Sequence, residues 1–353
     1  MLMYTLIGSE LLQHVHKPQL IKIAYPQVVP YLSTLYASLK AEVDHYDIGA
    51  DPYINYLLTE GSDEPNVPRK LERAYLSRNT YCYQQLRTIL TKSESIGVEL
   101  GACVTDWYIQ QSVARFHAKL RSSREMLDLS LEEKHHLMKI FNRLPLSSNP
   151  GSGVMSLGRL SSKVEALVNI LAAETGPNVT CLIFIEQRSW VAALAEILSL
   201  HPKTQGRFTM GTYVGGSLST KRKTSIGNLI DPNNQPDTLE KLQAGQIDLV
   251  LTTSVLEEGI DVSTCDLVIC FESPKNLKSF VQRRGRARRK ESKFFIFLPE
   301  AEVSQRLIDW ESLEEDMKRA YLKDLHTWML EERVQPIEEE DDETRFYRVS
   351  STG

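Results

Sequence analysis

The sequence predicts an α/β protein with a parallel sheet covered by helices on both faces, an all-α insertion and a long C-terminal helix. Between residues 154 and 300, short continuous apolar runs alternate with amphipathic segments, which is typical of a parallel sheet buried on both faces. Residues 31–150 show helical spacing and almost no strand pattern. From Val303 to Tyr321, apolar side chains recur along one narrow helical stripe.

The expected elements divide the chain into four parts. The run 20–25 near the N-terminus is strand-like, and Pro26 and Pro30 break it. Gly245 follows an expected helix at 238–244, where glycine commonly ends a helix. Strands of the sheet are expected at 179–185, 208–214, 247–252, 266–271 and 294–298. The four parts are residues 1–30, the helical insertion 31–150, the sheet domain 151–300, and a helix with an acidic tail at 301–353.

Composition narrows the class of protein. A net charge of −5 argues against a uniformly basic coat, so any nucleic acid must bind to local patches. The five cysteines form no C-x-x-C pair, and the eight histidines form no metal constellation, so no metal site is expected. His135 and His136 are expected on a solvated helix surface. Tyr81, Tyr83, Trp107 and Tyr108 are expected in the bundle core. No membrane contact is expected, and the cytoplasm or nucleus is the expected location.

The densest motif is the arginine run from Gln282 to Arg289, with five arginines in eight residues. Such a run would repel itself on an ordinary surface. The planar guanidinium fork matches phosphate oxygens, and arginines can stabilise the charge that develops during phosphoryl transfer. Its position between two expected strands favours a site. The alternative is a basic stretch for localisation or nonspecific RNA binding.

Three more polar segments follow expected strands, where open α/β sheets bind their ligands. Arginine can reach a phosphate, a glycine pair lets a nucleic-acid backbone come close, and hydroxyls at a helix start suit an anion. Taken singly, these segments also fit a surface arginine, a plain turn and a capped loop. Their candidate residues are Arg188, then Gly215 and Gly216, and then Thr253, Ser254, Gly259 and Asp261.

In this order the four segments resemble motifs IV, IVa, V and VI of superfamily 2 helicases. The Arg-Gly-Arg-Ala-Arg sequence at 284–288 resembles the Dicer and RIG-I-like branch of that superfamily. The resemblance implies that residues 151–300 form the second, C-terminal RecA-like lobe, and that 31–150 is the insertion of this branch. Residues 1–30 would follow a first lobe that the sequence lacks. Residues 301–353 would form a pincer-like helix and the acidic tail.

The resemblance also implies roles for single residues. Arg286 and Arg288 would act in catalysis at the γ-phosphate of ATP. The nucleotide, with Mg²⁺, would be held mainly by the first lobe, and Arg289 is the alternative to Arg288. The remaining nucleotide contacts would come from Gln282, Gly259 and Asp261. The backbone of double-stranded RNA would be contacted by Arg188, Gly215, Gly216, Thr253 and Ser254.

The sequence lacks the phosphate-binding loop G-x-x-x-x-G-K-[ST] and the Asp-Glu-x-His or Asp-Glu-x-Asp box of a first lobe. We therefore expect this chain alone to hydrolyse no ATP. It would be a truncated product, a fragment, or a partner that completes a first lobe in cis or in trans. The whole protein would be an RNA-stimulated ATPase or translocase of RNA silencing and antiviral defence, with possible ribonuclease III activity elsewhere.

Two alternatives remain open at this stage. The chain could be a non-catalytic module that binds double-stranded RNA or docks a dsRNA-binding protein. It could instead be the second lobe of a Fanconi-type DNA translocase, because that class shares motifs IV–VI and a helical insertion.

Overall fold

The computed structural model describes most of the chain. The described residues are 19–26, 33–63, 65–121, 129–147, 160–174, 179–215, 225–230, 235–257, 265–305, 312–320 and 322–323. Among them no helix is both long and apolar enough to cross a membrane.

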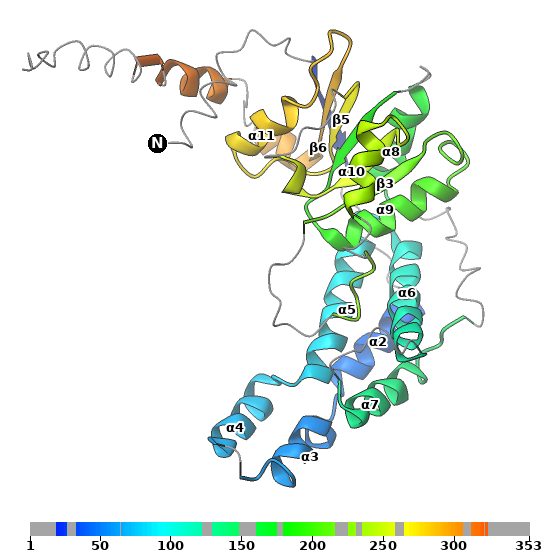
Figure 1. Cartoon of the computed structure of the whole chain (residues 1–353), viewed down its shortest axis with the longest axis vertical. Coiled ribbons are helices and arrows are strands. Elements are labelled where there is room, and N and C mark those ends of the chain that lie inside the picture. The colour runs from blue at the N-terminus through cyan, green and yellow to red at the C-terminus, as the bar shows by residue number, and fades with distance from the viewer. Residues whose placement is uncertain are drawn as a thin grey trace, which may run out of the picture. The chain divides into compact units, whose positions relative to one another are not determined.

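A six-stranded parallel sheet organises the second half of the chain (Figure 1). Its order is β1-β6-β5-β2-β4-β3, and every paired neighbour runs parallel. The strands are β1 (Gln19–Tyr25), β2 (Cys181–Phe184), β3 (Met210–Tyr213), β4 (Leu249–Thr252), β5 (Leu267–Cys270) and β6 (Lys293–Pro299). The predicted strands are confirmed. The run at 20–25 is the edge strand β1, which pairs with β6.

Helices cover both faces of this sheet. Every residue of β2, β4 and β5 is buried, which requires cover on both sides. Right-handed crossovers put α8 (Ser162–Ala173) and α9 (Arg188–Leu200) on one face. The same rule puts α10 (Gln235–Gln243) and α11 (Leu277–Arg284) on the other, where Phe280 of α11 packs edge-on to Phe294 at 5.8 Å. The fold is RecA-like. Gly245, just beyond α10, has a φ of 70°, as expected at a helix end.

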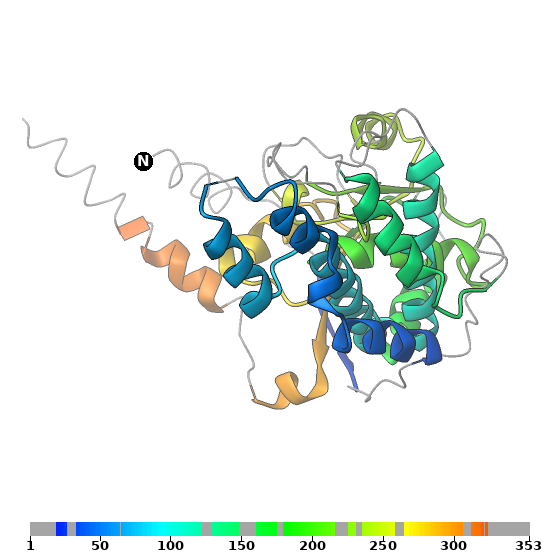
Figure 2. The ribbon, with the colours of Figure 1, turned by 90° about the horizontal axis from the view of Figure 1, so that it is seen from below.

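The insertion is a helical bundle. Its elements are α2 (Thr34–Asp44), the 3-10 turn η1 (Ile48–Ala50), α3 (Pro52–Leu58), α4 (Val67–Ser77), α5 (Tyr81–Glu99), α6 (Ala102–Arg121) and α7 (Leu131–Phe141). Ser33, Thr80 and Ser130 cap helix starts with their hydroxyls. The long helices α5 and α6 pack along each other, and Figure 2 shows the shorter α2, α3 and α4 in the foreground.

The bundle core confirms one prediction about side chains and corrects another. Tyr83, Trp107 and Tyr108 are buried, as predicted for core aromatics, and Tyr81 is half-buried and packs against the same core. His135 is exposed, but His136 is half-buried, and its Nε2 lies 3.0 Å from the Tyr46 hydroxyl. The prediction of a solvated surface was therefore wrong for His136, because its ring packs edge-on against the Tyr46 ring, with 5.6 Å between the ring centroids.

A buried ion pair joins the insertion to the lobe. Lys163 of α8 is 1% exposed, and its ammonium donates to Glu99 of α5 at 2.7 Å. The rings of Tyr25, Trp190 and Phe271 surround this ammonium, with Phe271 closest at 4.2 Å from Nζ to ring centroid. Because the cation is out of water, the carboxylate and the ring faces must replace its hydration.

The lobe also reaches back onto the insertion through residues 225–230, here called the strap. The Ile226 N–H donates to Gln85 of α5 at 2.8 Å. The Tyr108 hydroxyl donates to the Gly227 carbonyl at 2.7 Å, and Arg115 donates to the Leu229 carbonyl at 2.6 Å. The strap therefore crosses both long helices of the bundle.

The C-terminal part is described only in pieces. Helix α12 (Glu300–Gln305) follows β6, and residues 312–320 and 322–323 are helical. Residues 312–320 and 322–323 belong to a unit separate from residues 15–307. Residues 306–311 lie outside the described part of the chain, as do the acidic tail and the first 18 residues. The single long helix and its pincer role therefore stay predictions.

Candidate functional site

The polar segments that follow the strands meet at one edge of the sheet. Phe184 at the end of β2 is in register with Thr252 of β4 and Cys270 of β5. Tyr213 at the end of β3 is in register with Thr252 as well. Because these strands are parallel, the residues after them share the carboxyl edge, where open α/β sheets bind ligands.

Three residues predicted to contact RNA lie together at this edge. Arg188 begins α9, and Gly215 follows β3. The Gly215 N–H points to the Thr253 hydroxyl oxygen at 3.5 Å. A methyl group on Gly215 would lie 3.7 Å from a guanidinium nitrogen of Arg188 and 3.4 Å from Val255. The glycine therefore leaves its backbone close to a cation and a hydroxyl, an arrangement that suits a phosphate.

The segment after β4 differs from the expected helix start. Ser254–Leu256 form only one 3-10 turn, η4, and Thr253 makes no side-chain cap bond to it. The Thr252 hydroxyl is turned to its own backbone and donates to the Thr253 carbonyl at 3.0 Å. Ser254 is exposed beside it. Gly216, Gly259 and Asp261 lie outside the described residues, so their predicted roles remain predictions.

The insertion adds a second cation beside Arg188. Lys92 lies on α5, one turn before Ser95, which accepts a hydrogen bond from the Trp190 indole at 3.2 Å. Burial and the nearby charge of Arg188 lower the pKa of the Lys92 ammonium. Among the described residues, neither Lys92 nor Arg188 has an ion-pair partner. Nothing in the sequence around Lys92 indicated this position.

The two arginines predicted to be catalytic differ in their anchoring. Arg286 is half-buried, and its guanidinium donates to the Glu257 carbonyl at 2.7 Å, which brings it to the segment after β4. Arg288 is exposed, and its Nε donates to the Gly285 carbonyl at 2.7 Å. Gln282 is half-buried on α11 in the same region.

Arg289, the alternative to Arg288, is engaged at the opposite edge. Its guanidinium pairs with Asp266 at 2.5 Å, just before β5 begins. The same carboxylate accepts the Thr180 N–H at 2.9 Å, just before β2. Both contacts lie at the amino edge of the sheet, away from Arg188 and Thr253.

A buried arginine that the sequence analysis did not single out links two strand ends. Arg283 is 1% exposed and donates to Glu257 at 2.7 Å and to Glu186 at 2.5 Å. Lys275 also pairs with Glu186 at 2.5 Å. We call Glu186, Glu257 and Arg283 the edge clamp. A carboxylate shortly after each of two strands, together with the arginine run, was the available signal. The clamp also explains why the run tolerates its charge: Arg283 turns inward to two carboxylates.

Electrostatics at the clamp depend on a neighbouring carboxyl group. The Glu186 N–H points to the Glu272 carboxylate at 3.3 Å. Burial raises the pKa of Glu272 to about 7, although the Lys163 ammonium works against that rise. Burial also pushes the pKa of Glu186 upward, but hydrogen bonds and charge from Lys275 and Arg283 outweigh it and lower that pKa.

Comparison with known proteins agrees with this geometry. Residues 162–291 match the helicase conserved C-terminal domain family. Dicer-like protein 2 of Phaeosphaeria nodorum is 44% identical over 353 residues, covering 98% of this chain. Dicer-like protein 2 of Aspergillus fumigatus is 36% identical over 341 residues, covering 94%. The chain belongs to the helicase region of the Dicer-like family.

The Dicer-like relatives are much longer than this chain, which spans 25% of the first relative and 24% of the second. A solved structure, the Pyrococcus furiosus Hef helicase domain, is also similar, with a TM-score of 0.39 and 16% identity. That match covers 83% of this chain and 59% of the other. It is too distant to carry any argument about function.

Proposed function

We propose that this Dicer-like chain is the second half of an RNA-stimulated ATPase, completed by a first RecA-like lobe in cis or in trans. In this role the carboxyl edge faces two ligands, a nucleotide held mainly by the first lobe and the backbone of double-stranded RNA. One arrangement carries the proposal. Arg286 donates to Glu257, in the segment after β4 that also carries Thr253, and Thr253 lies beside Gly215, which in turn lies beside Arg188.

The residues at this edge fit a nucleotide anion. ATP with Mg²⁺ supplies the phosphoanhydride bond and its leaving group. Arg286 and Arg288 stabilise the charge that develops on the γ-phosphate, with Gln282, Gly259 and Asp261 lining the rest of the contact. The edge clamp holds the helix that directly precedes Arg286, and the Glu257 carbonyl accepts from the Arg286 guanidinium.

The same edge fits an RNA backbone. Arg188 and Lys92 supply positive charge, and Gly215 allows a close approach, while Thr253 and Ser254 supply hydroxyls. Contacts of this kind read shape and phosphate spacing, not sequence, which suits double-stranded RNA. The silencing and antiviral role, in the cytoplasm or nucleus, follows from the Dicer-like relationship and belongs to the same proposal.

The first prediction concerns turnover. This chain alone will hydrolyse no ATP, and adding the first lobe of a Dicer-like protein 2 will produce RNA-stimulated ATPase. Arg286→Ala will then lower kcat by about 10³-fold, because one charge-stabilising arginine is removed. Arg69→Ala, an exposed arginine of α4, is the matched control and should leave turnover unchanged.

Other outcomes separate the alternatives. Turnover by the chain without a first lobe, abolished by Arg286→Ala, would contradict the proposal. Tight binding of double-stranded RNA with no turnover in either mixture would favour the non-catalytic module. Preference for branched DNA over double-stranded RNA would favour a DNA translocase.

A further inference from the structure

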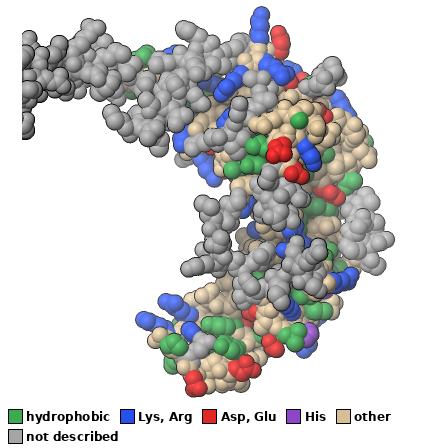
Figure 3. Space-filling view, in the orientation of Figure 1, with side chains coloured by type: hydrophobic (Ala, Val, Ile, Leu, Met, Phe, Trp, Pro, Cys, Tyr) green, Lys and Arg blue, Asp and Glu red, His purple; other side chains and the backbone are tan. Residues whose placement is uncertain are grey.

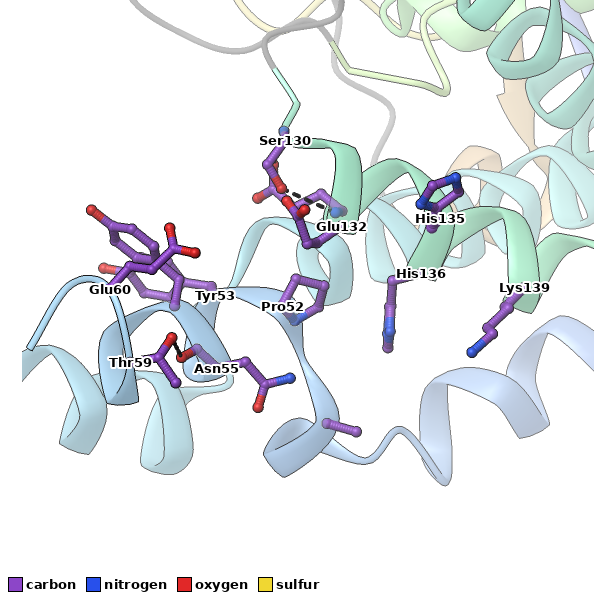
Figure 4. A pocket seen from close by; sticks show the side chains of 13 residues that line it. Pro52, Tyr53, Asn55, Thr59, Glu60, Ser130, Glu132, His135, His136 and Lys139 are labelled. Atoms are coloured by element: carbon purple, nitrogen blue, oxygen red, sulfur yellow. Dashed lines mark hydrogen bonds between the residues drawn. The ribbon is translucent and has the colours of Figure 1, made fainter.

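The insertion carries a pocket far along the chain from every motif of the helicase lobe. It is a cavity of about 620 Å³, formed by α3 with the turn after it and by α7 with its N-cap Ser130. Figure 4 shows Tyr53 and Glu60 on the α3 side, Glu132 and His136 on the α7 side, and Pro52 between them. A volume of this size lies in the range of pockets that bind small organic ligands.

A buried hydrogen-bond network fixes the two walls relative to each other. Asp51, which is fully buried, accepts the Tyr46 hydroxyl at 2.5 Å and the Thr80 hydroxyl at 2.6 Å. It also accepts the Tyr53 N–H at the start of α3. Since the Tyr46 hydroxyl donates to Asp51, its oxygen is left to accept from His136 Nε2. The pocket is therefore built in advance of any ligand.

The pocket favours a cation. Glu60, Glu132 and Glu133 line it with three carboxylates, against the single ammonium of Lys139. Glu133 is held in the capping box with Ser130, and Glu60 and Glu132 line the pocket as exposed carboxylates. Hydrogen bonds from its own backbone and from Ser130 lower the pKa of Glu132, so this carboxylate is ionised at neutral pH. Burial lowers the pKa of His136, which therefore adds no positive charge there.

The pocket also offers aromatic faces. Tyr53 and Tyr56 both line it from α3. A ring face beside carboxylates suits a guanidinium better than an ammonium, because a guanidinium can stack while its five N–H groups reach several acceptors. A nucleic-acid phosphate would instead meet like charge.

The surface around the pocket is apolar enough for a protein contact. Leu58, Tyr75, Leu76 and Leu131 are exposed by 58%, 46%, 78% and 62%. They lie on α3, α4 and the start of α7, and Figure 3 shows hydrophobic side chains at this end of the bundle, with acidic and basic side chains among them. Exposed large apolar side chains next to a polar pocket are typical of a protein-binding surface.

We propose that the α3–α7 pocket binds an arginine side chain of a protein partner, with apolar residues of the partner covering the surrounding surface. Glu60 and Glu132 accept from the guanidinium, and the tyrosine rings stack on it. The partner is thus a protein with an exposed arginine flanked by apolar residues. This site is separate from the proposed ATPase and would persist if that proposal failed.

The test uses the whole chain with N-acetyl-arginine amide as the probe and N-acetyl-citrulline amide as its uncharged isostere. Binding is measured by saturation-transfer NMR. We expect the arginine probe to bind and the citrulline probe to bind about tenfold more weakly, because the charge-assisted hydrogen bonds are lost. The double variant Glu60→Gln, Glu132→Gln should bind the arginine probe more weakly by a similar factor. Glu72→Gln on α4, outside the pocket, should leave binding of the arginine probe unchanged.

Equal binding of the two probes would overturn the proposal, as would full binding by the double variant. Displacement of the arginine probe by double-stranded RNA would overturn it too, because the pocket would then belong to an RNA surface. Unchanged probe binding in the presence of RNA would support a protein ligand.

Discussion

Arg283 acts at the scale of one residue by neutralising two carboxylates that parallel strands bring together. Its guanidinium joins the segments after β2 and β4 and faces the ring of Phe184 at 5.1 Å. Breaking a buried ion pair by removing one partner leaves the other charge uncompensated, which typically costs about 3–5 kcal/mol. The clamp is therefore a structural support for the helix that carries the arginine run.

Glu272 gives a prediction about pH. Its pKa is raised from 4.5 to about 7, so the folded chain binds this proton more tightly than the unfolded chain does. The resulting stability is fully present below pH 4.5 and is lost as the pH rises through 7. Glu272→Gln should therefore raise the Tm at pH 8 by much more than at pH 5. Thermal unfolding across this range measures the effect.

The control for Glu272 is Glu291→Gln, an exposed glutamate just before β6. It should leave the pH profile as it is. A Tm difference for Glu272→Gln that is the same at pH 5 and pH 8 would mean that the carboxyl group does not titrate in this range.

At the scale of elements, the sequence predicted the strands that are determined by a local run of apolar residues. Apolar runs gave β2, β4, β5 and β6, and the edge strand β1 was identified by its run at 20–25. The boundaries differ by one or two residues, because apolar residues such as Val179 and Ile185 continue beyond the paired stretch. The turn η4 differed more, since the Thr252 hydroxyl donates to the Thr253 carbonyl instead of capping a helix.

The site was predictable to a similar degree. Arg188, Gly215 and Thr253 meet because each follows a parallel strand, which the sequence indicates. The edge clamp and Lys92 were missed, because their partners lie tens of residues away and leave no periodic signal. The same reason hid the strap, whose contacts span more than 110 residues.

The strap gives a prediction at this scale. A methyl group on Gly227 would lie 2.5 Å from the Tyr108 hydroxyl oxygen, so Gly227→Ala should destabilise the chain by about 1–3 kcal/mol. In a Tyr108→Phe background that oxygen is gone, and the same change should cost much less. Urea unfolding of the four proteins gives the coupling energy. Equal costs in both backgrounds would mean that this contact does not hold the strap.

At the scale of the unit formed by residues 15–307, the insertion and the lobe share one hydrophobic core. A single cluster of buried side chains runs from Leu39 and Tyr108 in the bundle to Ile183 and Ile269 in the sheet. The Lys163–Glu99 pair and the strap cross the same boundary. The insertion and the lobe therefore form one folded unit and are not two domains joined by a linker.

Continuity of the core predicts cooperative unfolding. Leu39 in α2 is fully buried, so Leu39→Ala should lower the free energy of unfolding by about 2–5 kcal/mol. Hydrogen exchange in guanidinium should show α5 and β2 losing protection together, with both midpoints lowered equally by this change. Leu76→Ala, at an exposed position, should move neither midpoint. A midpoint that falls in α5 alone would show that the bundle unfolds independently.

The edge position of β1 bears on how this protein can be cut for expression. The helicase family match covers residues 162–291, which excludes β1 and all of β6. A piece trimmed to that match would leave β5, buried at all four residues, as the new margin of the sheet. An exposed apolar edge strand pairs with the edge strands of other chains, so we expect such a piece to aggregate in inclusion bodies. A soluble product needs residues 19–25, and it therefore also needs the insertion, which lies between these residues and the other strands of the sheet in the sequence.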